Sequence, residues 1–192
     1  MVTKTKISKN DAVKMVAKAI ATLYKHKYDI VPKVAVGEDV FKRFLNRCLL
    51  WDATELKIDQ DESFHRIRYV GIDYWSEKAI KHWKRYKKGN GMLIHEHMIP
   101  KKVLLAKIDE NPKDAEHVQS ILKKYAIAVV VHKSDDKKLS KAQKKLEKKN
   151  PKWYDDDKTG RYKEAGIEIY ATGGVAPSSS SCKPKRIKLS NL

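Results

Sequence analysis

Cysteine is scarce in this chain of 192 residues, which contains only Cys48 and Cys182. Two distant cysteines cannot build a disulfide framework, and their spacing does not match a zinc ribbon. Cys48 lies in an apolar helical pattern and Cys182 in a polar segment. We therefore expect two reduced thiols, with Cys48 buried.

Long apolar runs are also missing. No stretch approaches the roughly 20 apolar residues that a membrane-spanning helix needs, and residues 1–6 lead into no signal-type apolar region. Internal repeats are absent as well. We expect a soluble, intracellular protein, cytoplasmic by default, with one core and its appendages.

Acidic residues are few relative to basic ones. The 24 Asp and Glu stand against 42 Lys and Arg, which gives a formal net charge of +18 and a pI near 9.7. Such a charge favours nucleic acid or an anionic surface as the partner. Because no membrane span is present, nucleic acid, DNA or RNA, is the expected partner rather than a membrane.

The N-terminal part shows helical periodicity. Apolar residues recur at helical spacing over 8–28, behind the possible capping residues Ser8, Asn10 and Asp11. A break marked by Pro32 and Gly37 precedes a similar pattern over 40–49. These patterns predict two amphipathic helices that can pack as a hairpin.

Short strands and helices alternate in the rest of the chain. The continuous apolar run over 126–131 is the strongest strand signal, because such a run is typical of a strand inside a core. Ser76, Pro100, Pro112 and Ser134 stand at expected helix starts. The patterns predict strands over 65–70, 92–98, 126–131 and 167–170, helices over 77–88, 100–108, 112–125 and 135–148, and a helical turn over 160–165. We expect the tryptophans to be core anchors rather than base-stacking platforms: Trp51, Trp75, Trp83 and Trp153.

The most informative motif follows an apolar strand pattern, where His95, Glu96 and His97 are followed by Pro100. The segment Glu96-His97-Met98-Ile99-Pro100 resembles the acid-His-apolar-x-Pro motif of the HNH (ββα-metal) nuclease family, with Glu in place of the usual Asp. The segment 129–139 is similar to the strand and helix start where that family places its last metal ligand. The resemblance covers residues 76–170.

The resemblance implies an α+β fold in which N-terminal helices precede a ββα-metal (HNH-like) core with inserted helices. It implies that His97 is the general base, and that Glu96 and Asp136 hold one divalent cation against the scissile phosphate. Carboxylate oxygens suit Mg²⁺ or Mn²⁺. His132 or His95 could instead be a ligand, and an imidazole would favour Zn²⁺, Ni²⁺ or Co²⁺. A metal-dependent endonuclease that hydrolyses DNA is the first expectation.

The chain departs from the family pattern in three ways. The middle Asn, which orients the base, has no clear counterpart, and Asn111 is the one asparagine in the connection. Asp136 replaces the usual His or Asn, and a helix is inserted between the two halves. Asp135 and Asp136 would equally complement the start of a helix. A non-catalytic basic nucleic-acid-binding protein derived from this fold is therefore the alternative, and a partner protein that docks through its N-terminal helices is a third.

Lysines follow the proposed site at helical spacing. Such lysines would contact phosphates and make binding weaker in salt, although a solvated helix face is the other interpretation. No base-reading motif is visible. The expected nucleic-acid-binding residues are Lys101, Lys102, Lys137, Lys138, Lys141, Lys144 and Lys145.

Three parts are expected along the chain: an N-terminal helical region over 1–73, the HNH-like core over 74–172, and a disordered basic tail over 173–192. The tail is rich in Gly, Ser and Pro and lacks the apolar content to fold. Its basic run over 183–188 resembles a nuclear-import signal and equally suits a nonspecific arm, so a nuclear location stays open.

Overall fold

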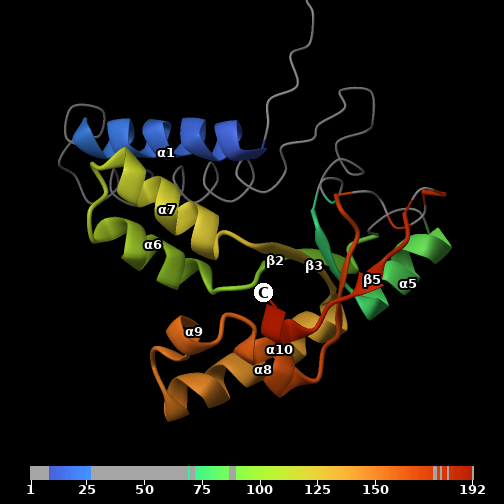
Figure 1. Ribbon diagram of the computed structural model, residues 1–192. Helices are drawn as coiled ribbons and strands as arrows, with labels where there is room; N and C mark the ends of the chain where they lie inside the picture. Colours follow the sequence, from blue (N-terminus) through green and yellow to red (C-terminus); the bar gives the residue numbers. More distant parts are fainter. Residues whose placement is uncertain are drawn as a thin grey trace, which may run out of the picture. The chain divides into compact units, whose positions relative to one another are not determined.

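The computed structural model describes residues 9–26, 69, 72–86, 90–174, 177, 179–180 and 182–191, and these residues form a mixed α+β structure (Figure 1). The chain divides into two compact units, one of residues 1–56 and 100–126 and the other of residues 57–99 and 127–192. The helix expected over 40–49, Cys48 and Trp51 lie outside the described residues. So does the strand expected over 65–70, apart from Tyr69.

The first unit is helical in its described part. It contains α1 (Lys9–Lys25), α6 (Lys101–Asp109) and α7 (Ala115–Tyr125), and α7 packs against both of the others. Each helix buries one apolar stripe, as the helical spacing predicted; on α1 it consists of Val13, Ala17, Ile20 and Ala21. None of the helices in the described part of the chain combines the length and apolar character that a membrane crossing requires.

The start of α7 differs from the prediction. The helix was expected from Pro112, but it begins at Ala115, where the Asp114 carboxylate accepts a hydrogen bond of 2.8 Å from the Glu116 backbone N–H. A side-chain acceptor satisfies a backbone N–H that the helix itself leaves unpaired, which a proline cannot do. The capping residue therefore decides where the helix begins.

The second unit contains a five-stranded mixed sheet in the order β2-β3-β1-β4-β5. β1 runs parallel to β3, and the other neighbours are antiparallel. β3 lies between two strands, as its continuous apolar run predicted. The strands are β1 (Tyr74–Ser76), β2 (Leu93–His97), β3 (Ala128–His132), β4 (Ile169–Ala171) and β5 (Lys185–Arg186).

Two cores cover the two faces of this sheet. One face, here called the α5 face, packs Leu93, Ala128 and Val130 against α5 (Glu77–Tyr86). The other, the α8 face, packs Val129 and Val131 against Leu139 and Tyr162 from two helices. These helices are α8 (Lys133–Lys149) and α10 (Gly160–Ala165), and the short α9 (Trp153–Asp156) lies between them in sequence.

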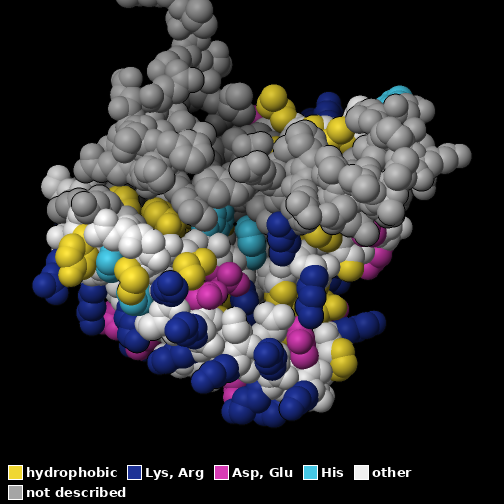
Figure 2. All heavy atoms as spheres, turned by 180° about the vertical axis from the view of Figure 1, so that it is seen from behind, with side chains coloured by type: hydrophobic (Ala, Val, Ile, Leu, Met, Phe, Trp, Pro, Cys, Tyr) yellow, Lys and Arg dark blue, Asp and Glu magenta, His cyan; other side chains and the backbone are white. Residues whose placement is uncertain are grey.

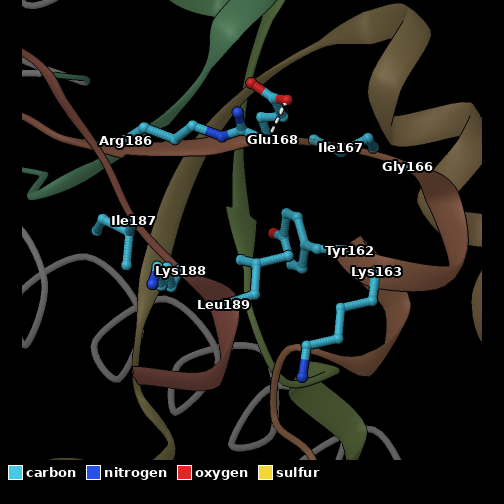
Figure 3. A pocket seen from close by; sticks show the side chains of 9 residues that line it. All are labelled: Tyr162, Lys163, Gly166, Ile167, Glu168, Arg186, Ile187, Lys188 and Leu189. Atoms are coloured by element: carbon cyan, nitrogen blue, oxygen red, sulfur yellow. Dashed lines mark ion pairs between the residues drawn. The ribbon is translucent and has the colours of Figure 1, made fainter.

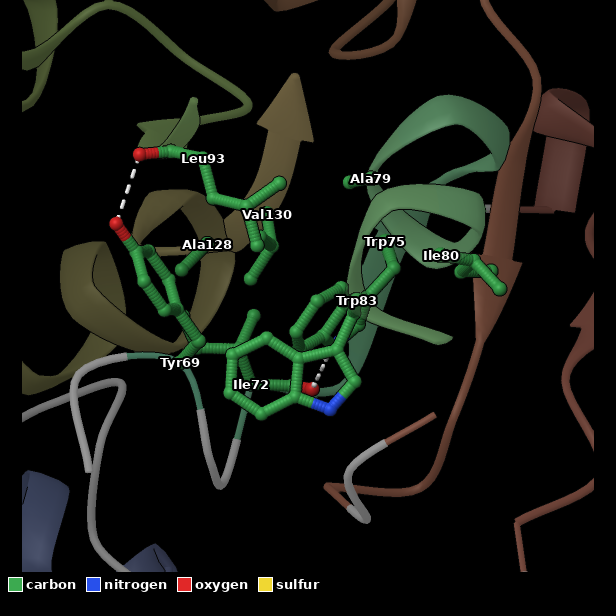
Figure 4. Packing of buried hydrophobic residues seen from close by; sticks show 9 residues of the cluster. All are labelled: Tyr69, Ile72, Trp75, Ala79, Ile80, Trp83, Leu93, Ala128 and Val130. Atoms are coloured by element: carbon green, nitrogen blue, oxygen red, sulfur yellow. Dashed lines mark hydrogen bonds between the residues drawn. The ribbon is translucent and has the colours of Figure 1, made fainter. Parts of the chain in front are cut away.

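The core on the α5 face contains a cluster of aromatic side chains (Figure 4). The rings of Trp75 and Trp83 meet edge to face with centroids 5.5 Å apart, and Tyr69 meets Trp83 at 6.2 Å. Trp75, Trp83 and Trp153 are all buried, which confirms that these three are core residues.

Two predictions are wrong: the capping residue of α8 and the disorder of the C-terminal tail. The expected cap of α8, Ser134, lies inside the helix, and the His132 ring accepts from the Ser134 backbone N–H at 3.2 Å. In the tail, β5 pairs with β4, and the 3₁₀ turn η1 (Leu189–Asn191) packs Leu189 against the core on the α8 face. The prediction of disorder is therefore wrong for these segments, because an open sheet edge and an apolar contact were present for them.

Candidate functional site

The adjacent residues Glu96 and His97 point to opposite faces of the sheet. In β2, Glu96 is opposite Val129 and His97 is opposite Ala128. Directly opposed residues of an antiparallel pair share a face, and successive residues alternate between faces. Glu96 therefore lies on the α8 face, whereas His97 lies on the α5 face.

The expected general base has a histidine as its neighbour. His95 and His97 are on the same face of β2, with ring centroids 5.1 Å apart. Both rings are half-buried. The structure thus brings together the two imidazoles of the motif, but it separates them from the carboxylate between them.

On the α8 face, Glu96 forms an ion pair with a buried arginine. The Nη2 of Arg161 lies 2.5 Å from the Glu96 Oε1, and the arginine side chain is 3 % exposed. Its Nε donates to the backbone carbonyl of Met98 at 3.1 Å, and its Nη1 donates to the Gln143 Oε1 at 3.4 Å. One guanidinium from α10 therefore joins the end of β2 to the middle of α8.

Asp136 belongs to the same electrostatic neighbourhood. Burial raises the pKa of Glu96, Arg161 opposes this change, and the negative charge of Asp136 adds to the increase. Burial also raises the pKa of Tyr162, and the charges of Glu96 and Asp136 contribute there too. The charge of Asp136 therefore acts on Glu96, while the ion-pair partner of Glu96 is Arg161, which the sequence did not single out.

The metal site that the resemblance implied has no counterpart among the larger ligand groups of the described residues. They contain no group of three or more His, Cys, Asp or Glu side chains arranged to hold an ion. His97 is on the opposite face from Glu96, and the nearest partner of Glu96 is already a cation. The assignment of Glu96 and Asp136 as metal ligands stays a prediction.

The alternative ligand His132 lies at the other end of the strand pair. It is opposite Leu93, four residues from the pair of His97 with Ala128, which corresponds to about 13 Å along a strand. Its Nδ1 lies 2.9 Å from the Ser134 Oγ and caps α8. Its contacts therefore assign His132 to the start of the helix.

We expect the cap to make stability depend on pH. Burial lowers the pKa of His132 in the folded protein, and the charges of His82 and Lys78 lower it further, against the opposing effect of Asp135. The unfolded chain therefore takes up a proton more readily, so the His132 contribution is complete above about pH 6.5 and is lost as the pH falls through the folded pKa. Urea unfolding at pH 7.5 and 5.5 measures the loss. The variant His132→Asn keeps a capping acceptor without titrating, and an equal loss in that variant would contradict this role.

Helix α8 carries a row of exposed lysines. It contains eight lysines against three acids, and all eight are exposed. Of the acids, Asp135 is buried and accepts from the Ser76 Oγ at 2.8 Å, while Glu147 accepts from Gln143. In Figure 2, Lys and Arg side chains crowd the lower edge of the molecule, the region where α8 runs in Figure 1. One exposed surface of this helix carries the five lysines that were expected to bind nucleic acid. It is here called the α8 lysine surface and consists of Lys137, Lys138, Lys141, Lys144 and Lys145.

Two of the expected nucleic-acid-binding lysines belong to the other unit. Lys101 and Lys102 form the start of α6, where Lys102 is exposed and burial lowers the pKa of Lys101. Asn111 also lies in this unit, and its side-chain amide is 3.5 Å from the Asp114 carboxylate beside the α7 cap. The two lysines thus lie on α6, and Asn111 lies in the connection between α6 and α7.

A basic pocket of about 640 Å³ lies beside α10 (Figure 3). Lys163, Arg186 and Lys188 line it together with apolar side chains, among them Ile167 and Leu189. Arg186 pairs with Glu168 at 2.5 Å, and Lys163 pairs with Asp157 at 2.7 Å. Exposed pairs of this kind are weak, so both cations can exchange partners. The segment expected to be a tail therefore supplies one wall of this pocket.

No family model, curated protein or solved structure matches the chain, so comparison with known proteins does not assign a function.

The residue that sequence reasoning missed is Arg161. The available signal was its position in a short turn directly before Tyr162, in a segment that also contributes Ile167 to the core. An arginine within a buried segment requires a carboxylate partner, and the sequence could not indicate which one.

Proposed function

We propose that this protein binds nucleic acid, DNA foremost, through the phosphate backbone and without catalysis. The observation that carries the proposal is the α8 lysine surface, in a chain with a net charge of +18. Phosphate contacts supply most of the affinity of sequence-independent binding. The pocket beside α10 adds three further cations on the same unit.

The spacing of the lysines suits a nucleic-acid backbone. Lys137, Lys141, Lys144 and Lys148 recur every three or four residues, so they form one stripe along the helix. The stripe is about 16 Å long, which corresponds to roughly five base-pair steps of duplex DNA. It can therefore contact several successive phosphates at once.

The unit holds α8 firmly on its inner side. Leu139 and Ala142 are buried, and Gln143 accepts from the buried Arg161. Lys145 pairs with Glu164 of α10 at 2.5 Å. A helix fixed in this way presents its lysines without having to become ordered on binding, which lowers the entropic cost of association.

Replacing Lys137, Lys141 and Lys144 with Gln should weaken DNA binding and reduce its salt dependence. Each neutralised phosphate contributes about −0.9 to the slope of log K against log salt, so the triple variant should reduce the slope by about 2 to 3. Fluorescence anisotropy with a labelled duplex between 50 and 300 mM NaCl measures this change.

The matched control removes three exposed helical lysines of the other unit: Lys14, Lys18 and Lys123. It changes the net charge equally. If both variants lose the same affinity and slope, binding follows total charge and the α8 lysine surface has no special part. A triple α8 variant with the affinity and slope of the wild type would refute the proposal.

A metal-dependent endonuclease is the second candidate. It is favoured by the antiparallel pair of β2 and β3, which α6 and α7 separate in the chain, followed by α8, and by the effect of the Asp136 charge on Glu96. The arrangement of His97 and Arg161 counts against it, because the expected base and the expected acid lie on different faces.

Plasmid nicking with Mg²⁺, Mn²⁺ or Ni²⁺ separates the two candidates. Binding without catalysis predicts no cutting above that of a mock preparation purified in the same way. Cutting by the wild-type chain that disappears in His97→Ala, with DNA affinity unchanged, would establish the endonuclease instead.

A further inference from the structure

The pocket beside α10 has a cationic rim above an apolar floor. Its three cationic side chains, Lys163, Arg186 and Lys188, are exposed. Tyr162 and Ile167 line the same pocket but are only 0 % and 6 % exposed, so they lie at its bottom. The volume of about 640 Å³ is that of an ordinary small-molecule site. The pocket can therefore hold a ligand that joins a charged group to an apolar body.

The C-terminal wall of this pocket alternates between charged and apolar side chains. Arg186 and Lys188 are exposed, whereas Ile187 and Leu189 are partly buried, and all four line the pocket. In Figure 3 this segment lies opposite α10 and the turn that follows it. One short segment thus supplies both the cations of the rim and part of the apolar surface.

Hydrogen bonds hold this wall in place. The Ile187 backbone N–H donates to the Ile169 carbonyl at 3.0 Å, directly after the pairing of β5 with β4. The Thr159 hydroxyl donates to the Leu189 carbonyl, also at 3.0 Å. Because the wall is ordered without a ligand, little entropy is lost when a ligand binds.

The charge of the lining suits a phosphate group. Three cations stand against one carboxylate, that of Glu168, so the lining is positive by two. A phosphate monoester carries a charge of about −1.5 to −2 at neutral pH and has three acceptor oxygens, so two cations can bind it at once. Arg186 is 66 % exposed in its ion pair with Glu168, so water screens that pair. A phosphate can therefore displace the carboxylate.

We propose that this pocket binds a single nucleotide, with the phosphate between Arg186 and Lys188 and the base against Ile187 and Leu189. A few apolar side chains are enough to cover a flat ring but not a long acyl chain, and a guanidinium can stack on a base. A free nucleotide and the unpaired end of a nucleic-acid strand share this chemistry. The inference goes beyond backbone binding by the α8 lysine surface and does not depend on it.

Adenosine 5′-monophosphate (AMP) is the probe, and two of its parts are the matched ligands. Adenosine lacks the phosphate, and ribose 5-phosphate lacks the base. Each should bind about tenfold more weakly than AMP or worse, because one loses charge-assisted hydrogen bonds and the other loses apolar burial. Isothermal titration calorimetry at low salt measures all three affinities.

A pair of variants tests the location. Arg186→Gln combined with Lys188→Gln should weaken AMP binding by about tenfold or more. The matched control combines Lys183→Gln with Lys185→Gln, which removes two exposed cations of the same segment that do not line the pocket. The control should keep the wild-type affinity. All four side chains are exposed, so both variants should unfold at the wild-type temperature.

The triple variant of the α8 lysine surface separates this inference from the proposed function. It should bind AMP as the wild type does, even though its DNA binding is weakened. A blunt DNA duplex and the same duplex with a one-nucleotide overhang then identify the natural ligand. A preference for the overhang that the Arg186, Lys188 variant loses would assign the pocket to strand ends, and equal affinities would assign it to a free nucleotide.

Three outcomes would overturn the proposal. The first is a wild-type protein that does not bind AMP. The second is equal affinity for AMP and ribose 5-phosphate, since the apolar surface would then contribute nothing. The third is the same AMP affinity in the pocket variant and its matched control, because binding would then not depend on the two cations of the rim.

Discussion

Replacing Arg161 with Met should destabilise the second unit by about 3–5 kcal/mol. The change leaves the Glu96 carboxylate without its cation in a largely buried place, and breaking a buried pair from one side costs about this much. It also leaves the Met98 carbonyl and the Gln143 amide without their donor. Natural domains are stable by only about 5–15 kcal/mol, so most of that margin would be lost. Urea unfolding followed by tryptophan fluorescence measures the change.

A double-mutant cycle with Glu96→Gln separates the charge from the packing. The double variant contains no unpaired buried charge, so it should recover a large part of the loss. The neighbouring pair of Lys145 and Glu164, which is exposed on the lysine side, is the control. Lys145→Met should cost no more than about 1 kcal/mol. Equal losses in Arg161→Met and Lys145→Met would show that the buried pair has no special role.

Replacing Trp83 with Ala should cost about 3–5 kcal/mol as well, for a different reason. The indole is 2 % exposed and touches both Trp75 and Tyr69, so its removal leaves a cavity between α5 and the sheet. Chemical unfolding monitored by far-ultraviolet circular dichroism gives the loss. The slope of the free energy against denaturant should stay unchanged if only the folded state is affected.

The control for this variant lies on the same helix. Tyr86 is 43 % exposed, and Tyr86→Ala should change stability by less than about 1 kcal/mol. Both variants replace an aromatic residue of α5 with alanine, and the two positions differ in how deeply the side chain is buried. Similar losses for both changes would mean that helix propensity, and not core packing, dominates at α5.

Periodicity predicted the elements whose signal is local. The strands β2 and β3, the helices α1 and α8 and the turn of α10 are present where apolar spacing indicated them. The cap at Ser76 is confirmed, since its Oγ accepts from the Ala79 backbone N–H at 3.3 Å. The strand β1 was missed, because three residues are too few to show alternation. β5 was missed because its two exposed basic residues show no strand pattern of their own and form a strand only by pairing with the edge strand β4.

The candidate site was predictable in its residue types but not in its arrangement. The adjacency of Glu96 and His97 in sequence suggested a shared site, yet strand alternation sends them to different faces. Asp136 lies in the first turn of α8, directly after the strand that pairs with β2, and its charge acts on Glu96. Arg161 is 65 residues from Glu96 in the chain, and no local pattern joins residues at that distance.

By itself, the sequence determined the charge of this protein, the lysine spacing of α8 and the apolar runs that become β2 and β3, because these depend only on composition and local periodicity. Only the tertiary structure decided which charges meet. The pairing of Arg161 with Glu96 and the separation of His97 from that pair follow from sheet register and helix packing, which bring together residues from distant parts of the chain.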